Sequence, residues 1–351
     1  MKTILNLGYG KTILHERCQQ GIMSSRLLYG TEEIRQTKRY EVVDCSLTDC
    51  GGVAGLLRNN LKAIEKADIV YLSYIYESPL LLLAFLKKIG LLKRTLIGVS
   101  HRTVKKEGGF WECWMRKFVY RSFDKILFHS RKNMEESIAS EMVKASQAEF
   151  LYWGDDLTFV DRTFPEKPMG DFLISTGREN RDYHTLIEAF ADSHWKIEIY
   201  TNRQIGDNCY DDLAEQQGRH ENVDIRFVDK SNDTTLALAK RLSECRAVTI
   251  PLMKDKIDYC VGLTSVIEAM AYGKPIISTY NPYSPIDIEK EGIGFFVETA
   301  DDWRKAVAFL MEHPDEASAM GQRARRLAEE QYNIRQCAQQ VERIMSEQSE
   351  K

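Results

Sequence analysis

Two segments in the second half of the sequence place charged or hydroxyl side chains beside glycines. In the first, Gly177, Arg178 and Arg181 follow the apolar run 171–176 and precede a helix-like stretch. The planar guanidinium of arginine pairs well with phosphate oxygens, and glycine lets a ligand come close to the backbone. Arginines at a strand-to-helix turn are, however, commonly just solvated. The segment alone is therefore only a candidate anion site.

The second segment opens a helix-like stretch with small residues. Gly262, Thr264 and Ser265 stand at its start, and Glu268 follows about one turn later. The N-terminus of a helix presents free N–H groups and its positive dipole end to an anion, and a carboxylate at that depth can accept hydrogen bonds from a ribose diol. Alternatively, Thr264 or Ser265 is only a helix cap and Glu268 only balances the dipole.

Further candidates lie in the first half of the chain. His101 comes directly after the apolar run 95–99, and a histidine there can either bind a hydroxyl or be structural. Gly8 and Gly10 begin like a dinucleotide fingerprint, but the third glycine and the acidic residue after the next strand are missing, which excludes NAD binding. The amide of Gly10 and the side chain of His15 remain candidates for a ligand contact, with a solvated loop as the alternative.

Short apolar runs alternate with longer amphipathic stretches along the chain, and the elements that they predict must position these residues. This pattern is typical of parallel strands that are buried on both faces and joined by helices. It predicts an α/β protein with two Rossmann-like, doubly wound parallel sheets, and the helix-favouring stretch 301–348 breaks near 313–314 and 332–333. The predicted strands are 3–7, 40–43, 69–73, 95–99, 125–129, 171–176, 196–200, 223–227, 247–251 and 275–279.

The domain boundary is expected at residues 161–170, where two prolines, a glycine and mixed charges disfavour regular structure. Residues 1–160 then form the N-terminal domain, 161–170 a hinge linker and 171–332 the C-terminal domain. Residues 333–351 form a final helix that is a candidate for packing back on the N-terminal domain.

Composition narrows the function further. The chain has 351 residues and a formal net charge of −4, so no general field attracts nucleic acid. Its eight cysteines are scattered without metal-ligand spacing, which indicates reduced thiols and no zinc site. Neither an export signal nor a run of about 20 apolar residues is present. We expect a cytoplasmic protein that is soluble or lies at the inner face of the membrane.

Residues 105–121 mix aromatic and basic side chains at helical spacing. Such a helix either lies in a bilayer interface or turns its aromatic face to the core, and the sequence leaves both open. The nearby apolar run 80–86 is expected to be a buried helix.

The stretch from Gly177 to Phe190, together with that from Gly262 to Pro275, resembles the paired donor-site signatures of glycosyltransferase family 4 in order and separation. The segments 123–130, 153–156 and 292–297 are also similar to this family, and the similarity is weakest before residue 90. The resemblance implies a GT-B fold, with two Rossmann-like domains facing a central cleft. It also implies a retaining glycosyltransferase that uses a nucleotide diphosphate sugar, without a metal or another cofactor.

Carried over by position, the resemblance implies that Arg178 and Arg181 contact the donor diphosphate and that Glu268 binds the ribose. Thr264 and Ser265 would lie on the phosphate loop, and Gly177 and Gly262 are further candidate donor-binding residues. Related enzymes often have a histidine where this chain has His101, which makes it the candidate catalytic residue. Gly10, His15 and Cys260 are candidate donor or acceptor contacts. The acceptor would be a glycan or a lipid-linked sugar in surface polysaccharide or glycoconjugate synthesis, and residues 105–121 are the candidate membrane contact.

Two departures from the family pattern bear on activity. The second basic residue of the family pattern is usually a lysine a few residues farther along the chain. Here Arg181 fills that role on a shorter loop. Cys260 stands eight residues before Glu268, where family members commonly have a second glutamate, and a neutral thiol cannot replace that charge. Sugar recognition is then altered, taken over by a neighbour such as Asp258, or lost in an inactive nucleotide-sugar or glycan-binding relative. A nucleotide-sugar epimerase of GT-B type is a further alternative.

Overall fold

The computed structural model describes residues 1–8, 10–46, 64–75, 77–191, 193–205, 208–228 and 232–349. Tyr9 in the first glycine loop, residues 47–63 of the expected N-terminal domain and the last two residues of the expected final helix lie outside this part. The chain divides into two compact units: unit 1 is Met1–Trp153 with Ile334–Lys351, and unit 2 is Gly154–Asn333.

Unit 1 is built on a six-stranded parallel sheet with the order β2-β1-β3-β4-β5-β6. Its strands are β1 (Lys2–Gly8), β2 (Tyr40–Ser46), β3 (Ile69–Leu72), β4 (Thr95–Ser100), β5 (Lys125–Phe128) and β6 (Ala148–Phe150). Its helices include α1 (Lys11–Gln19), α2 (Thr31–Gln36), α4 (Glu77–Lys88), α5 (Phe110–Tyr120), α6 (Arg131–Ala139) and α13 (Ile334–Ser349), with the short helix η1 at Ser25–Leu28.

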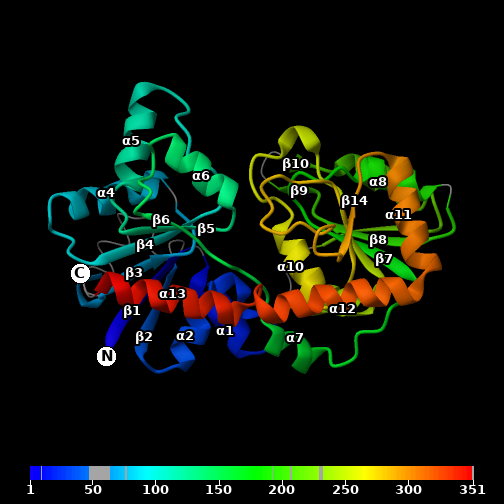
Figure 1. Cartoon of the computed structure of the whole chain (residues 1–351), viewed down its shortest axis with the longest axis horizontal. Helices are drawn as coiled ribbons and strands as arrows, with labels where there is room; N and C mark the ends of the chain where they lie inside the picture. Colours follow the sequence, from blue (N-terminus) through cyan, green and yellow to red (C-terminus); the bar gives the residue numbers. More distant parts are fainter. Residues whose placement is uncertain are drawn as a thin grey trace. The chain divides into compact units, whose positions relative to one another are not determined.

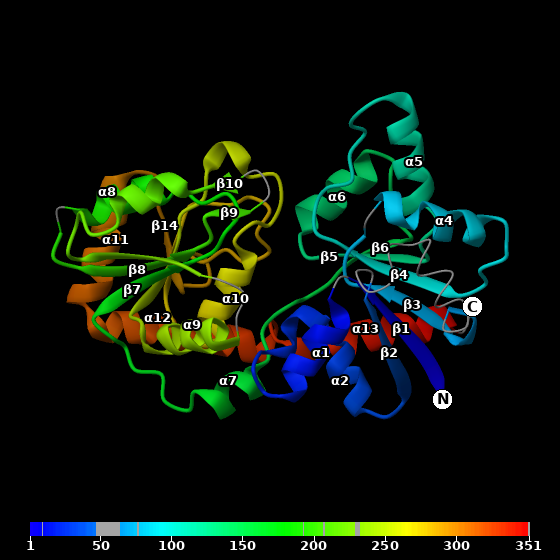
Figure 2. The ribbon, with the colours of Figure 1, turned by 180° about the vertical axis from the view of Figure 1, so that it is seen from behind.

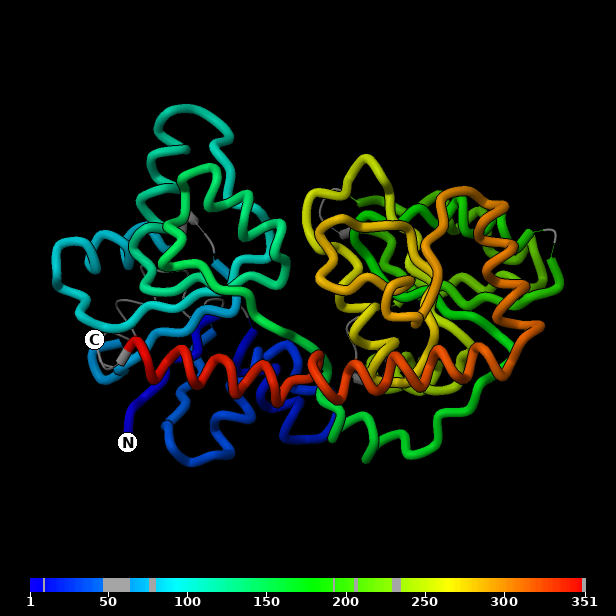
Figure 3. Tube along the Cα trace, viewed as in Figure 1, coloured from blue at the N-terminus to red at the C-terminus, as the bar shows by residue number. Residues whose placement is uncertain are grey.

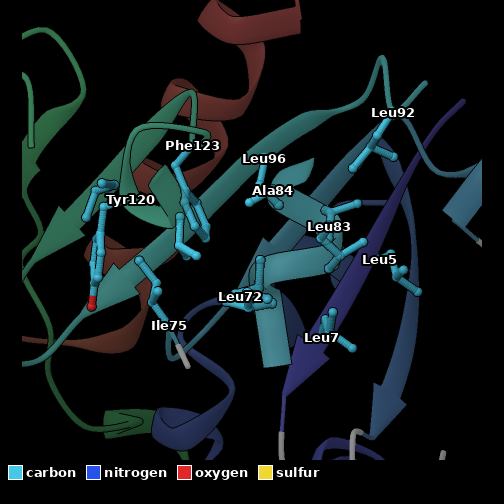
Figure 4. Packing of buried hydrophobic residues seen from close by; sticks show 14 of the residues in the cluster. Leu5, Leu7, Leu72, Ile75, Leu83, Ala84, Leu92, Leu96, Tyr120 and Phe123 are labelled. Atoms are coloured by element: carbon cyan, nitrogen blue, oxygen red, sulfur yellow. The ribbon is translucent and has the colours of Figure 1, made fainter. Parts of the chain in front are cut away.

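Helices cover both faces of this sheet because its strands are apolar on both sides. Figures 1 and 2 show α4, α5 and α6 on one face and α1, α2 and α13 on the other. On the α4–α5 face, Leu5, Leu72 and Leu96 from three strands pack against Leu83 of α4 and Tyr120 of α5 (Figure 4). The strand order reverses between β1 and β3, which is where open α/β sheets form ligand crevices.

Helix α13 belongs to unit 1, so both ends of the chain lie on this unit (Figure 3). Val341, Ile344 and Met345 are fully buried along one side of α13. The Gln340 side-chain amide donates to the carbonyl of Phe150 at 2.5 Å, and the Tyr40 hydroxyl lies 3.0 Å from Ser346 Oγ. Apolar burial and polar contacts thus both fix this helix.

Unit 2 repeats the architecture with the order β11-β8-β7-β12-β13-β14, all parallel. Counted within the unit this is the Rossmann order, and the reversal falls between β7 and β12. Its strands are β7 (Phe172–Thr176), β8 (Lys196–Thr201), β11 (Val223–Phe227), β12 (Ala247–Ile250), β13 (Ile276–Ser278) and β14 (Gly294–Phe296), with a small antiparallel pair β9 (Gln204–Ile205) and β10 (Asn208–Cys209). Its helices include α7 (Leu157–Thr163), α8 (Tyr183–Ala191), α9 (Asn232–Glu244), α10 (Leu263–Ala271), α11 (Ala300–Glu312) and α12 (Pro314–Glu330), with the short helices η2 (Asp211–Gln216) and η3 (Lys254–Lys256).

In unit 2, α8 and α11 cover one face of the sheet and α9, α10 and α12 the other (Figures 1 and 2). All ten predicted strands are confirmed, and so is the fold class of two doubly wound parallel sheets. The stretch 301–348, where two or three helices were expected, forms the three helices α11, α12 and α13. No helix in the described ranges is long and apolar enough to cross a membrane.

The segment expected as a linker, 161–170, falls inside unit 2 in this division, and it begins with the last turn of α7. Asp161 pairs with Arg325 at 2.6 Å. The amide of Gly170 donates to the carbonyl of Glu244 at 3.0 Å, and the fully buried Lys274 ammonium donates to the carbonyl of Pro168 at 2.6 Å. These contacts hold the segment to the body of unit 2, and its role as a hinge remains a prediction.

Candidate functional site

The N-terminus of α10 lies at the carboxyl end of β7, next to the reversal of the unit 2 sheet. Gly262 precedes the helix with φ of 89°, a left-handed conformation that favours glycine. The Ser265 side chain is buried, and its hydroxyl donates to the carbonyl of Thr176, the last residue of β7, at 3.0 Å. Thr264 beside it is exposed. Two segments that lie far apart in the sequence are thereby joined into one site.

Gly177 and Arg181 form the other half of this site. Gly177 has φ of 144°, and a Cβ atom there would lie only 2.5 Å from Arg181 Nε and 2.7 Å from Arg181 Cζ. The guanidinium of Arg181 lies against this glycine and donates to the carbonyl of Glu179 at 2.7 Å. A longer contact of 3.5 Å reaches Ser265 Oγ. Gly177 is therefore required both for its backbone angle and for the space that Arg181 occupies.

Arg181 is a deeply buried cation in unit 2. Only 4% of the residue is exposed, and its Nε atom has no hydrogen-bond partner. Among the residues that the structure describes, no carboxylate pairs with this guanidinium. Burying a charge is costly unless it is paired, so a polar ligand with negative charge would satisfy what the protein leaves unpaired.

The turn that carries Arg181 is held by residues that the sequence analysis did not single out. The Tyr210 hydroxyl accepts a hydrogen bond from the Arg181 amide at 2.9 Å, and the Tyr183 hydroxyl donates to the carbonyl of Gly177 at 2.7 Å. Burial raises the pKa of Tyr183 to about 12, so this hydroxyl keeps its proton at neutral pH. Nothing in the local sequence marks Tyr210, which is 29 residues away from Arg181.

The remaining predicted residues of unit 2 surround this arrangement at different depths. Arg178 is exposed and makes no ion pair within the described ranges. Glu268 is half-buried on the turn of α10 that follows Ser265. Both side chains are thus more accessible to solvent than Arg181 and Ser265.

Cys260 precedes the glycine of the α10 loop and is 7% exposed. Burial raises the pKa of its thiol to about 12, so the side chain is uncharged at neutral pH. The loop is fixed by Asn281, whose side-chain amide donates to the carbonyls of Tyr259 at 3.0 Å and Val261 at 2.9 Å. A rigid loop thus holds a neutral group at the position where the family commonly has a carboxylate.

His101 of unit 1 lies in a cluster of rings at the carboxyl end of the sheet. Its Nε2 atom is 3.0 Å from the carbonyl of Ser73, which favours the tautomer that carries its proton on Nε2. The ring of Tyr74 stacks on it with centroids 5.0 Å apart, and Tyr29 meets it edge-on at 5.6 Å. The orientation of this imidazole is therefore well defined.

A second histidine, His129, lies beside His101 with ring centroids 5.2 Å apart. His129 is 2% exposed, and burial, followed by the charge of His101, lowers its pKa to about 3. Its Nδ1 atom faces the carbonyl of Leu151 at 3.3 Å, whereas its Nε2 atom has no partner. His129 was not among the predicted site residues, although its place at the end of β5 matches that of His101 after β4.

Gly10 and His15 do not share one environment. Gly10, with φ of 64°, caps α1 and donates its amide to Ser46 Oγ at 2.9 Å at the end of β2. His15 lies one turn farther along α1, where its Nδ1 atom is 2.8 Å from a carboxylate oxygen of Glu32. The buried Lys11 next to Gly10 was missed: its ammonium donates to the carbonyl of Leu27 at 2.7 Å, and burial lowers its pKa to about 8.

A cavity of about 370 Å³ opens in unit 2 near the loop that follows β12. It is lined by residues of that loop, of the start of α8 and of α11, and none of the predicted site residues contributes to it. No group of three or more metal-ligating side chains occurs in the part of the chain that the structure describes. Metal independence remains a prediction about the reaction.

Comparisons with known proteins agree with this architecture. The structure is similar to that of Anabaena Alr3699/HepE in complex with UDP-glucose, with 14% identity, a TM-score of 0.68, and coverage of 99% of this chain and 100% of that chain. A glycosyltransferase from Rickettsia africae matches with 11% identity, a TM-score of 0.65 and coverage of 99% and 98%. A protein described as a putative UDP-N-acetylglucosamine 2-epimerase from Listeria monocytogenes matches with 13% identity, a TM-score of 0.61 and coverage of 100% and 98%. The chain therefore has the GT-B fold.

Residues 161–327, all in unit 2, match the family model described as glycosyl transferases group 1. No curated protein matches the sequence. The matched segment includes Arg178, Arg181, Ser265 and Glu268. The family match and the fold together support a glycosyltransferase.

Proposed function

We propose that this protein is a retaining glycosyltransferase of family 4 that moves a hexose-type sugar from a nucleotide diphosphate sugar to a glycan or lipid-linked acceptor. The proposed setting is surface polysaccharide or glycoconjugate synthesis in the cytoplasm, at the inner face of the membrane. The protein would meet that membrane through residues 105–121. Alr3699/HepE was crystallised with UDP and UDP-glucose, which makes uridine nucleotides the first donors to test.

The observation that carries this proposal is the unpaired guanidinium of Arg181 beside the N-terminus of α10. No carboxylate in the described part of the chain pairs with this buried cation, and the helix adds free N–H groups and the positive end of its dipole. The exposed Arg178 lies on the same loop and supplies a second cation. This combination suits a diphosphate, and Glu268 is then available for the ribose diol.

The proposed reaction follows from this charge distribution. The bond between the anomeric carbon and the diphosphate breaks, and the acceptor oxygen bonds to the same carbon from the same face. The acceptor proton passes to an oxygen of the departing diphosphate, so that no separate base is needed. Two arginines and a helix N-terminus would stabilise the charge that develops on the diphosphate, a role that a metal ion plays in other transferases.

A thermal-shift panel with UDP, GDP and their common sugar conjugates tests the donor site, because a bound ligand stabilises the folded state by mass action. We expect one nucleotide class to raise the melting temperature of the wild type and to lose most of this effect in Glu268→Ala. Glu312→Ala, on α11 of the same unit, is the matched control and should behave like the wild type. No shift with any nucleotide at millimolar concentration would refute the donor site.

Cys260 favours a second candidate function, a catalytically inactive nucleotide-sugar or glycan-binding protein. Its neutral, buried thiol offers no charge to the donor sugar or its phosphate. The likeness to the Listeria protein keeps a GT-B epimerase as another alternative. Incubation with the stabilising nucleotide sugar separates the three: transfer or slow hydrolysis indicates the transferase, conversion without acceptor indicates an epimerase, and an unchanged donor indicates the inactive protein.

A further inference from the structure

Helix α5 of unit 1 carries large aromatic side chains that the fold leaves exposed. Phe110 is 76% exposed, Trp111 75% and Trp114 51%. Their rings form a chain, with centroids 5.5 Å apart between Phe110 and Trp111 and 6.3 Å between Trp111 and Trp114. The core side of the helix is formed by Val119 and Tyr120. The interpretation that the aromatic face of residues 105–121 belongs to the core is therefore wrong for these three side chains.

Helix α4 packs against α5 and exposes a second apolar stripe. Leu82 and Phe85 of α4 lie about one turn apart and are 41% and 50% exposed, and Ile89 and Leu91 just after the helix are 51% and 73% exposed. Leu80, Leu83 and Ala84 on the opposite side are buried in the core. Figure 4 shows Leu83 and Ala84 in this position. The run 80–86, expected to be buried, thus faces the core with one side only.

The same part of the chain concentrates positive charge. Residues 80–121 contain ten Lys and Arg against two Asp and Glu, a net charge of +8, although the whole chain has −4. Lys88 and Lys93 among them are exposed, whereas Lys87 pairs with Asp124 at 2.7 Å and Lys106 with Glu141 at 3.0 Å. An excess of bases around exposed tryptophans is the combination that binds the interface of an anionic bilayer, where indole rings lie at headgroup depth.

We propose that the outer faces of α4 and α5 form one docking surface for a bilayer that contains anionic phospholipid. The surface comprises the two apolar stripes and the lysines around them, so it extends beyond residues 105–121. Its excess of bases argues against a second copy of the chain on the same surface, because two such surfaces would repel each other. The inference rests on the proposed function for its biological purpose, since it brings unit 1 to a lipid-linked acceptor.

Binding to vesicles tests the surface without nucleotide or acceptor, so its failure is distinguishable from a failure of the transferase assignment. The vesicles contain either 30% phosphatidylglycerol in phosphatidylcholine or phosphatidylcholine alone. We expect the wild type to sediment with the anionic vesicles at least tenfold more tightly than with the neutral ones, and to lose this preference in 0.5 M NaCl because salt screens charge.

Three variants separate the parts of the surface. Trp111→Ser with Trp114→Ser removes the α5 stripe, and Phe85→Ser with Leu91→Ser removes the α4 stripe; each pair should weaken vesicle binding at least tenfold. Tyr280→Ser is the matched control, because Tyr280 is 53% exposed but lies in unit 2, and it should bind like the wild type. All the changed side chains are at least half exposed, so melting temperatures should stay close to that of the wild type.

The proposal is wrong if the wild type does not distinguish anionic from neutral vesicles, or if both double variants bind as the wild type does. It is also wrong if the wild type is a dimer in light scattering and the double variants are monomers, because the surface would then be an interface between copies of the chain.

Discussion

At the scale of single residues, Arg181 and Gly177 depend on each other. The arginine can be buried beside the end of β7 only because the glycine has no side chain, and the glycine occupies a φ of 144° that other residues rarely adopt. The position of Arg181, which we assign to the diphosphate, therefore depends on the glycine at position 177.

Gly177→Ala should displace the Arg181 guanidinium, since the new methyl group would lie within 2.7 Å of Arg181 Cζ. We expect at least a tenfold loss of nucleotide affinity, measured by calorimetric titration, and a lower stability from the backbone strain alone by about 1–2 kcal/mol. Gly218→Ala is a matched control in the same unit: Gly218 has φ of 74°, but a Cβ atom there has open space around it. Wild-type affinity in Gly177→Ala would show that Arg181 does not hold the diphosphate.

How far the sequence predicted these residues depends on the kind of signal. Gly177, Arg181 and Ser265 follow predicted strands or open a predicted helix, so their types and positions indicated a shared site. Tyr210 and Asn281 support that site through single long-range hydrogen bonds, and no local pattern marks such contacts. Lys11 was overlooked because a lysine after a glycine loop is normally exposed, whereas here η1 closes over it and supplies the carbonyl of Leu27.

At the scale of elements, α10 depends on α12 as well as on its own sequence. Arg325 of α12 donates to the carbonyl of Ala271, the last residue of α10, at 2.6 Å. Gly321 of α12 lies directly against Gly273, so the two helices approach through a pair of glycines. The helix whose N-terminus faces the site is thereby anchored at its other end.

Gly321→Ala tests this anchor, because two effects of opposite sign compete. Alanine in the middle of a helix normally stabilises by about 0.5–1 kcal/mol relative to glycine. Here its methyl group would collide with the carbonyl oxygen of Gly273 and lie only 3.1 Å from the carbonyl carbon, and overpacking costs about 1–3 kcal/mol. We expect a net destabilisation of about 1–2 kcal/mol in urea unfolding. Gln322→Ala, at the exposed neighbouring position, should be neutral or slightly stabilising, and a stabilised Gly321→Ala would contradict the close packing.

The sequence predicted where helices and strands lie better than it predicted which of their sides are covered by other elements. Strands such as β7 and β12 are short, mainly apolar runs that stand out without the fold. The short strands β6 and β14 were not predicted, since β6 contains a glutamate and β14 begins with a glycine, whereas the equally short β13 is marked by two isoleucines. The exposed side of α4 was not predicted either: an apolar run shows that a helix has a buried side, but it does not show whether another element covers the opposite side.

At the scale of the whole molecule, the chain passes between the units twice, after Trp153 and after Asn333. Unit 1 is consequently built from two separate stretches of sequence, whereas unit 2 is continuous. The donor site that we propose lies entirely in unit 2 and the proposed docking surface entirely in unit 1. Donor binding and membrane docking can therefore be perturbed separately. Removing α13 is one way to perturb unit 1 alone.

Ending the chain at Asn333 should destabilise unit 1 and spare unit 2. The deletion removes Val341, Ile344 and Met345, which are fully buried in unit 1, and burying such a side chain contributes about 1.5–3 kcal/mol. Three of them approach the entire stability of a typical domain, about 5–15 kcal/mol. The amides of β1, β3 and β4 should therefore exchange much faster than in the full chain, whereas those of β7 and β12 should stay protected. The nucleotide that stabilises the full chain should slow the exchange of β7 and β12 further. Loss of protection in both units alike would mean that they fold as one cooperative body, and unchanged exchange in β1 would mean that α13 adds nothing to unit 1.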